Sequence, residues 1–203
     1  MKAVAAIVGI DHWYDITFPF VMSLRERNPT LDILVIDNCS NSPYPEIPLW
    51  RTVRMPTREG YNMALNVALA EDADWHIVFN NDCLCHHEFE SAIGGLDPHT
   101  LYGSGWQWSD SFQMHIQWSA WLAISRELKD TIGGFDPMLD AGFEDFDYQK
   151  RAVDAGFALD VFRIDVQHLD RHTRLVEADY AARWEKCRQY FSKKWGVPTT
   201  KWL

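Results

Sequence analysis

The first half of the chain alternates short apolar runs with segments of helical periodicity, and this alternation constrains the fold more than any other feature. Residues 4–9, 33–36 and 75–79 are apolar runs with the composition of buried strands. Residues 18–24 and 63–69 lie between them and carry apolar residues at helical spacing. Strands that alternate with helices predict an α/β fold with a mostly parallel central sheet flanked by helices.

The second half has a less regular pattern. It predicts two strands at residues 101–108 and 118–124, followed by a Gly-rich turn at residues 132–137. A helix at residues 144–155, a further strand at residues 157–166 and a closing helix at residues 176–194 complete the pattern. Three prolines after the second apolar run predict an extended connection, followed by a weaker strand at residues 52–55.

Composition bounds the class of protein. The chain has 203 residues, of which 47% are hydrophobic, which favours one globular domain. The formal net charge is -10 and no run of basic residues occurs, which argues against a general polyanion binder. The apolar run at residues 1–9 is too short for a signal sequence or a membrane span, so a cytoplasmic location with four reduced cysteines is expected.

Three polar residues, Asn80, Asn81 and Asp82, follow the apolar run at residues 75–79 directly. In open α/β sheets ligands bind outside the carboxyl ends of the strands, so Asp82 lies where a site is expected. The same tripeptide fits the start of an ordinary turn equally well. The other motifs of the chain decide between the two interpretations.

Four features occur in a fixed order along the sequence. They are Asp37 after the second strand, Asn80–Asp82, a Gly-Gly-Phe-Asp turn followed by Glu144-Asp145-Phe146-Asp147, and His168 after a late strand. This order and spacing resembles the inverting family two of the GT-A (nucleotide-diphospho-sugar transferase) glycosyltransferases, in its rhamnosyltransferase-like branch. The resemblance covers residues 4–168, and residues 190–196, YFSKKWG, are similar to the end of many such domains.

The resemblance implies a metal-dependent enzyme that moves a sugar from a nucleoside-diphosphate sugar to an acceptor hydroxyl. In a single domain over residues 1–203, residues 1–82 would bind the nucleotide, residues 83–174 would hold the acceptor and the catalytic groups, and residues 175–203 would form the C-terminal helix. The acceptor could be a glycan, a small molecule, a protein or a modified nucleobase. The sequence gives no basis for choosing the donor base, the sugar or the oligomeric state.

The resemblance assigns nucleotide binding to residues of the first half. Asp37 matches the aspartate that holds the base, and Asp11 lies at the same rim. Residues 60–66 match a Gly-x-x-x-Ala-x-Asn pattern that covers the nucleotide. Arg58 stands where many members have Asn, and a guanidinium there could face the diphosphate. The full set is Asp11, Asp37, Arg58, Tyr61, Asn62, Asn80 and Asn81.

The implied metal ion is Mn²⁺ or Mg²⁺. Asn80–Asp82 occupies the position of the Asp-x-Asp motif, with Asn80 in place of its first carboxylate, so binding would depend chiefly on Asp82. His168 matches the family's histidine ligand, which favours Mn²⁺, and His172 is the second candidate. A single histidine is more often structural, and only its place after the Glu-Asp motif favours a ligand.

The resemblance makes Asp145 the catalytic base, because an inverting transfer needs a carboxylate that takes the acceptor's proton on the face opposite the leaving group. Glu144 would orient the acceptor or exchange roles with Asp145, and Asp147 would support the helix. Acidic residues in a helix's first turn also suit its dipole. Gly134 would let the backbone approach the sugar, and Trp106 could form an acceptor wall or simply pack.

Three alternatives remain. Cys83, Cys85, His86 and His87 could suggest zinc, although such closely spaced ligands make a poor tetrahedral site. A sugar-1-phosphate nucleotidyltransferase would carry a Gly-rich basic loop after the first strand, and residues 9–12 do not form one. A catalytically degenerate nucleotide- or carbohydrate-binding module on the same fold is the stronger rival, because Asn80 departs from the motif.

Overall fold

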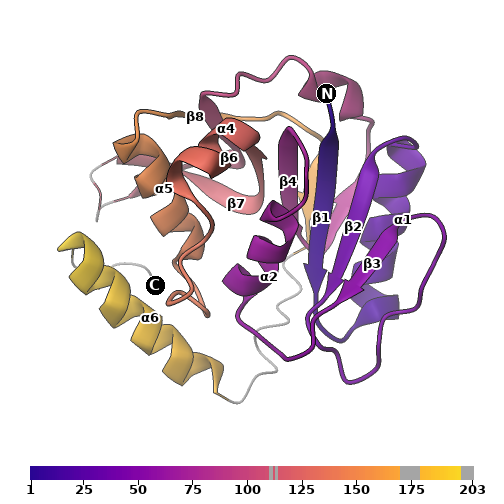
Figure 1. Cartoon of the computed structure of the whole chain (residues 1–203), viewed down its shortest axis with the longest axis horizontal. Helices are drawn as coiled ribbons and strands as arrows, with labels where there is room; N and C mark the ends of the chain where they lie inside the picture. The colour runs from indigo at the N-terminus through magenta and orange to yellow at the C-terminus, as the bar shows by residue number, and fades with distance from the viewer. Residues whose placement is uncertain (110–111, 113, 170–178, 198–203) are drawn as a thin grey trace.

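The computed structural model describes residues 1–109, 112, 114–169 and 179–197, and the structural statements below concern these residues. A seven-stranded sheet forms its centre (Figure 1). Its spatial order is β3 (Arg51–Arg54), β2 (Asp32–Asp37), β1 (Ala3–Gly9), β4 (Trp75–Asn80), β7 (Met114–Ser125), β6 (Thr100–Ser109) and β8 (Ala158–Val161). The first three pairs and β6–β8 are parallel, whereas β7 pairs antiparallel with β4 and β6, so the mostly parallel sheet is confirmed.

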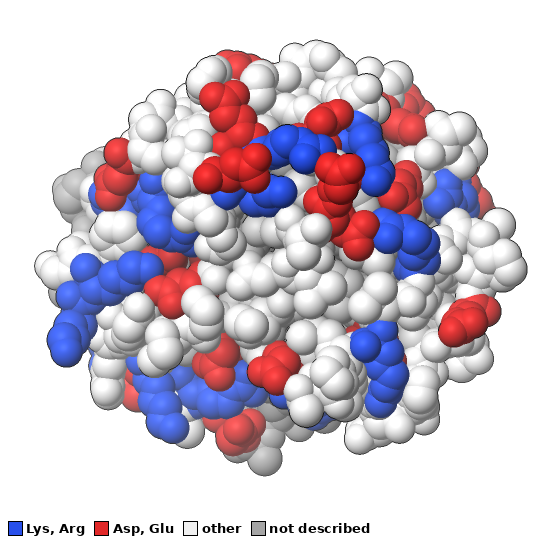
Figure 2. All heavy atoms as spheres, viewed as in Figure 1, with Lys and Arg blue, Asp and Glu red and all other residues white. Residues whose placement is uncertain are grey.

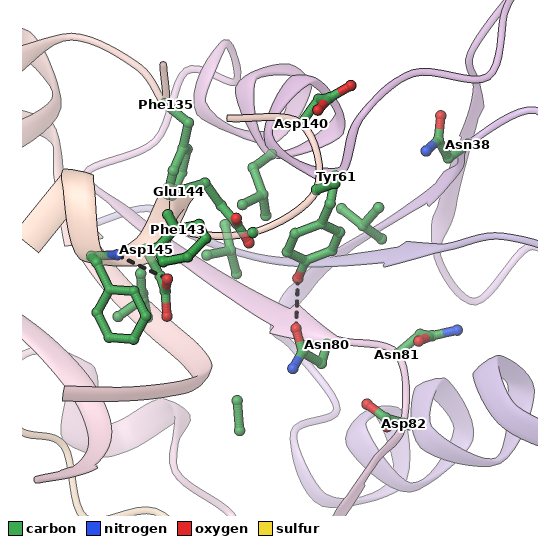
Figure 3. A pocket seen from close by; sticks show the side chains of 18 of the residues that line it. Asn38, Tyr61, Asn80, Asn81, Asp82, Phe135, Asp140, Phe143, Glu144 and Asp145 are labelled. Carbon is green, nitrogen blue, oxygen red and sulfur yellow. Dashed lines mark hydrogen bonds between the residues drawn. The ribbon is translucent and has the colours of Figure 1, made fainter. Parts of the chain in front are cut away.

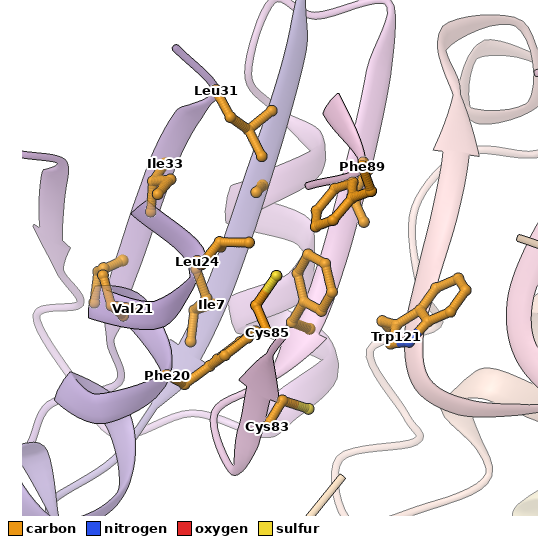
Figure 4. Close-up of a cluster of buried hydrophobic side chains, with 14 of the residues drawn as sticks. Ile7, Phe20, Val21, Leu24, Leu31, Ile33, Cys83, Cys85, Phe89 and Trp121 are labelled. Carbon is orange, nitrogen blue, oxygen red and sulfur yellow. The ribbon is translucent and has the colours of Figure 1, made fainter. Parts of the chain in front are cut away.

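Helices cover both faces of this sheet. On β1, Ala5 and Ile7 pack toward α1 (Phe18–Arg27), whereas Val4, Ala6 and Val8 pack toward α2 (Tyr61–Leu69), α4 (Arg126–Ile132) and α5 (Glu144–Asp154). Figure 4 shows the α1 side of this core. Because both faces of the central strands are buried, these strands consist of consecutive apolar residues in the sequence.

The segment predicted as one strand over residues 157–166 is instead two strands. β8 ends at Val161, and β9 (Val166–His168) pairs antiparallel with β5 (Cys83–Cys85) in a separate two-stranded sheet. Phe162, which is buried in the core, makes the last bond to β6, from its backbone N–H to the Gly103 carbonyl at 3.2 Å. The chain then leaves the main sheet.

Four short elements are absent from the sequence prediction: the π-helical turn Trp13–Thr17, β5, α3 (Glu90–Ile93) and α4. Of these, α4 begins at a Ser125 cap, whose Oγ accepts a bond from the Leu128 N–H at 3.0 Å. The closing helix α6 spans Tyr180–Trp195. Residues 176–178 of its predicted range, and His172, lie outside the described residues. Within the described part of the chain, no helix has the length and apolar character needed to cross a membrane.

Candidate functional site

A cavity of about 990 Å³ opens where β1 and β4 end. Its lining comes from the ends of these strands, from β6, from residues 140–146, from β9 and from α6. Parallel strands deliver their carboxyl ends to one edge of a sheet, and this edge is where such folds bind ligands. Figure 3 shows Glu144 and Asp145 on the side of the cavity opposite Asn81 and Asp82.

The two predicted metal ligands lie together. Asp82 directly precedes β5, and the register of β5 with β9 places Cys83 opposite His168. The Asp82 Oδ1 atom lies 3.0 Å from His168 Nε2, which also lies 3.3 Å from the Asn80 amide nitrogen. One imidazole nitrogen cannot both donate to the carboxylate and accept from the amide. In either tautomer, His168 Nε2 can therefore form a hydrogen bond with only one of Asp82 and Asn80.

This arrangement fits a divalent cation. Two neighbouring ligands of an octahedral ion, each about 2.1 Å from it, are about 3 Å apart. The described residues contain no group of three or more His, Cys, Asp or Glu side chains that could hold a metal ion. A cation bound here would therefore need further ligands besides Asp82 and His168.

Asn80 links this pair to α2. The Tyr61 hydroxyl donates to Asn80 Oδ1 at 2.8 Å and also lies 3.3 Å from the Phe79 carbonyl (Figure 3). Burial, together with the nearby Glu144 carboxylate, raises the pKa of Tyr61 well above its usual range. Tyr61 therefore remains a neutral donor that fixes Asn80 with its amide nitrogen toward His168.

Glu144 and Asp145 enter the cavity at the start of α5. The backbone turns sharply just before them, with φ of 126° at Gly142 and 69° at Phe143. A left-handed conformation at a bulky residue such as Phe143 costs free energy, and such strain is often found at functional sites. Asp145 Oδ1 accepts a bond from the Phe146 N–H at 2.8 Å.

Three of the predicted nucleotide-binding residues lie near the carboxyl ends of the first two strands. Asp37 is fully buried, and its carboxylate accepts bonds from the N–H groups of Ser40 and Tyr44 at 2.8 and 3.1 Å and from Arg54 at 2.5 Å. Arg58 donates to Asp11 at 2.8 Å. Asp37, Asp11 and Arg58 are not among the described residues that line the cavity, whereas Tyr61, Asn80 and Asn81 are.

The contacts of Asp37 predict a pH-dependent contribution to stability. Burial raises its pKa, but the hydrogen bonds from Ser40, Tyr44 and Arg54 outweigh burial and leave the pKa below its usual value. The carboxylate therefore stabilises the fold above the unfolded-state pKa of about 3.9, and this contribution is lost as the pH falls through the folded-state value. We expect Asp37→Asn to lower the free energy of unfolding at pH 7 by about 2 kcal/mol.

Urea unfolding of both proteins from pH 7 to pH 3 measures this effect. The difference between wild type and Asp37→Asn should shrink toward the acidic end. A difference that stays constant over the whole range would contradict the assignment.

Asn62 and Gly134 act in packing in this structure. Asn62 is buried and donates to the Asp136 carbonyl at 2.6 Å, and Asn66 bonds the Phe135 N–H and carbonyl at 2.7 and 3.0 Å. A Cβ at Gly134 would lie 2.4 Å from Asn66 Oδ1. Both asparagines therefore hold the Gly-Gly-Phe-Asp turn against α2, and Gly134 permits this close approach.

Asn81 and Trp106 differ in their placement. Asn81 lines the cavity, and its amide donates to Thr17 Oγ1 at 3.0 Å. Trp106 is 45% exposed and lies with its ring edge against His115, whereas its neighbours Gly105 and Gln107 line the cavity. The proposed sugar contact of Trp106 thus stays a prediction, made for a residue outside the described lining.

Sequence reasoning missed the contribution of α6. Tyr180, Arg183 and Trp184 line the cavity, although the sequence marked only the apolar face of this helix. No local signal reveals over which part of the sheet a helix packs. Of the four residues that could have suggested zinc, Cys83 and Cys85 are buried in the core, where Figure 4 shows them.

The fold is that of the GT-A glycosyltransferases, to which the chain is similar in structure. No model of a known protein family matches the chain, and no curated protein matches it in sequence. Among solved structures it is similar to GalNAc-T7 with UDP, GalNAc and Mn²⁺, at 16% identity and a TM-score of 0.67. It is also similar to the mannosyltransferase PcManGT from Pyrobaculum calidifontis in complex with GDP-Man and Mn²⁺, at 17% identity and a TM-score of 0.69.

The S. aureus TarS fragment 1–349 in complex with UDP is a third similar structure, at 13% identity and a TM-score of 0.62. These comparisons cover 100%, 95% and 99% of this chain. The chain spans 55% of GalNAc-T7, 64% of PcManGT and 74% of the TarS fragment. At these identities the likeness establishes the fold, and activity is a separate question.

Proposed function

We propose that this protein is a metal-dependent inverting glycosyltransferase that moves a sugar from a nucleoside-diphosphate sugar to an acceptor hydroxyl. One observation carries the proposal: a single cavity on this fold contains the Asp82–His168 pair on one side and the Glu144–Asp145 pair on the other. Similar structures contain UDP or GDP-Man, two of them with Mn²⁺, which supports a donor of this class. The family two assignment is part of the proposal.

The charge of the cavity supports a bound cation. Its described lining contains five carboxylates and one guanidinium: Glu59, Asp82, Asp140, Glu144, Asp145 and Arg183. Carboxylates close to a bound diphosphate repel it, and a cation between them reduces this repulsion. A divalent ion, Mn²⁺ or Mg²⁺, held by Asp82 and His168 would supply charge neutralisation for the diphosphate as it leaves.

In the proposed reaction Asp145 accepts the proton of the acceptor hydroxyl while that oxygen forms a bond to the anomeric carbon of the donor sugar. The bond from this carbon to the diphosphate breaks on the opposite face, so the configuration inverts. Glu144 orients the acceptor. Residues 1–82 hold the nucleotide, with Tyr61, Asn80 and Asn81 at the cavity and with Asp11, Asp37 and Arg58 at the rim.

Calorimetric binding of a panel of nucleoside diphosphates and nucleotide sugars, with and without Mn²⁺, tests the proposal. We expect one nucleotide to bind the wild type in a metal-dependent manner. Asp82→Ala should weaken this binding at least tenfold, because it removes the carboxylate from the ion. Asp130→Ala, which removes an exposed carboxylate on α4, is the matched control and should bind like the wild type.

Metal-dependent binding to no member of the panel would remove the central claim. Metal-dependent binding without any release of nucleoside diphosphate from the donor would favour the degenerate binding module instead. Donor hydrolysis, which needs no added acceptor, therefore separates the enzyme from the module.

A further inference from the structure

The proposed roles of Asp82 and Asp145 give the direction in which a nucleotide would lie in the cavity. A cation at Asp82 and His168 would hold the diphosphate near the end of β4. Figure 3 shows Asp145 and Asn38 at opposite sides of the cavity. Because the donor sugar has to lie next to the proposed base Asp145, the nucleoside has to extend the other way, toward Asn38.

The end of β2 is within reach of such a nucleoside. The strand order β2, β1, β4 places β2 two strand spacings from β4, or about 10 Å at about 4.8 Å for each spacing. A ribose and a base that extend from the diphosphate bridge this distance. Asn38 directly follows β2 and lines the cavity, so the base would lie beside Asn38.

Two polar side chains at this end of the cavity are engaged by the protein itself. The Asn38 amide donates to the Glu59 carbonyl at 2.8 Å and accepts from the Glu59 N–H at 3.0 Å. Asp37 is fully buried, lies outside the described lining and accepts three hydrogen bonds from neighbouring groups of the protein. Both side chains therefore hold the loops that surround the base.

Glu59 presents a carboxylate at the same end of the cavity. It lines the cavity, and the two bonds to Asn38 fix its backbone next to the end of β2. The Thr57 hydroxyl donates to Glu59 Oε1 at 2.7 Å, and Oε2 has no hydrogen-bond partner within the described part of the chain. An ionised carboxylate accepts hydrogen bonds and donates none. Glu59 therefore favours a base whose edge carries donors.

The surface charge leaves the selection of a nucleotide to such local contacts. On the face shown in Figure 2, acidic and basic side chains are interspersed rather than gathered into a basic patch. A basic patch would attract the phosphates of any nucleotide, whichever base it carries. A contact to the base itself therefore has the larger effect on which nucleotide binds.

We propose that the donor nucleotide carries guanine and that the Glu59 carboxylate recognises this base. Guanine presents two adjacent donors, N1–H and the 2-amino group, which match the two oxygens of a carboxylate. Adenine and cytosine place a ring-nitrogen acceptor beside their amino group, and uracil places a carbonyl on each side of N3–H. The carboxylate repels these acceptors. The inference rests on the proposed glycosyltransferase function and adds the class of donor.

Calorimetric binding of the diphosphates of guanosine, uridine, adenosine, cytidine and inosine, each with Mn²⁺, tests the inference on the wild type. We expect guanosine diphosphate to bind at least about tenfold more tightly than the uridine, adenosine and cytidine diphosphates, which is the effect of a hydrogen bond to a charged group. Inosine diphosphate lacks the 2-amino group and should bind about tenfold more weakly than guanosine diphosphate.

Glu59→Gln should change the preference in a way that a purely structural role would not. The glutamine amide accepts from N1–H and donates to a carbonyl at position 2, which is the pattern that xanthine presents. We expect the variant to bind guanosine diphosphate about tenfold more weakly than the wild type does, and xanthosine diphosphate more tightly. Glu26→Gln changes an exposed carboxylate of α1 outside the described lining, and this matched control should keep the wild-type preference.

Two kinds of failure are distinguishable. Tighter binding of another of the natural diphosphates, equal binding of all of them, or an unchanged preference in Glu59→Gln would overturn the inference and leave the proposed function in place. Binding of no diphosphate would contradict the proposed function and the inference with it. The comparison of diphosphates needs only the wild type, so it decides the question even if Glu59→Gln fails to fold.

Discussion

Replacement of Asp145 with asparagine is expected to lower kcat for release of the nucleoside diphosphate by about 10²- to 10⁴-fold, which is the range that a general base contributes. The asparagine has nearly the same shape as the aspartate and can still accept the bond from the Phe146 N–H. It cannot take the proton of an attacking hydroxyl. Donor affinity should therefore stay within about twofold of the wild type.

The measurement is donor hydrolysis, in which water takes the place of the acceptor and loses its proton to the same base. Glu144→Gln is the paired variant, because Glu144 lies beside Asp145 in the same cavity. If Glu144→Gln loses the rate and Asp145→Asn keeps it, the two carboxylates exchange roles. If both variants keep the wild-type rate, neither carboxylate is the base.

Removal of the Asp147 side chain should cause the largest loss of stability. This carboxylate is fully buried and accepts bonds from Arg151 Nε at 2.9 Å and from Trp195 Nε1 at 3.0 Å, and it pairs with Lys194. Asp147→Ala would leave these donors facing an apolar gap. Breaking a buried charge pair typically costs about 3–5 kcal/mol, and we expect about 3 kcal/mol here because Arg151 and Lys194 are partly exposed.

Urea unfolding at pH 7 measures this loss, and Asp154→Ala provides the control. Asp154 lies on the same helix and pairs with Lys150 on its exposed surface, so its removal should cost less than about 1 kcal/mol. Equal effects of the two substitutions would show that the buried network does not hold α6 to α5.

The central sheet could be predicted because its strands are buried on both faces. Residues 4–9, 33–36 and 75–79 are recognisable as strands without any knowledge of their partners. The second half could not be read in this way. β5 and β9 have three residues each and form only because they pair with each other, although they lie far apart in the sequence. The local hydrophobic pattern of either segment gives no indication of this pairing.

The candidate site could be predicted in part for a similar reason. Asp82, Glu144, Asp145 and His168 lie at or next to the first or last residue of a regular element, and the structure brings all four to one cavity. The contribution of Trp184 was missed because an apolar position on an amphipathic helix has the same appearance whether it packs in a core or lines a cavity. Gly134 was assigned to a sugar, whereas its packing against Asn66 becomes visible only when α2 is in place.

The pairing of β5 with β9 has a consequence for how this site tolerates change. The positions of Asp82 and His168 are set by main-chain register, with Cys83 opposite His168, and not by the long connection between the two strands. Insertions at Gly94 and Gly95, which are exposed in that connection, are therefore expected to leave the spacing of the two side chains intact. A slip of one residue in β9 would turn His168 to the opposite face, and a slip in β5 would displace Asp82, so either slip would separate the two side chains.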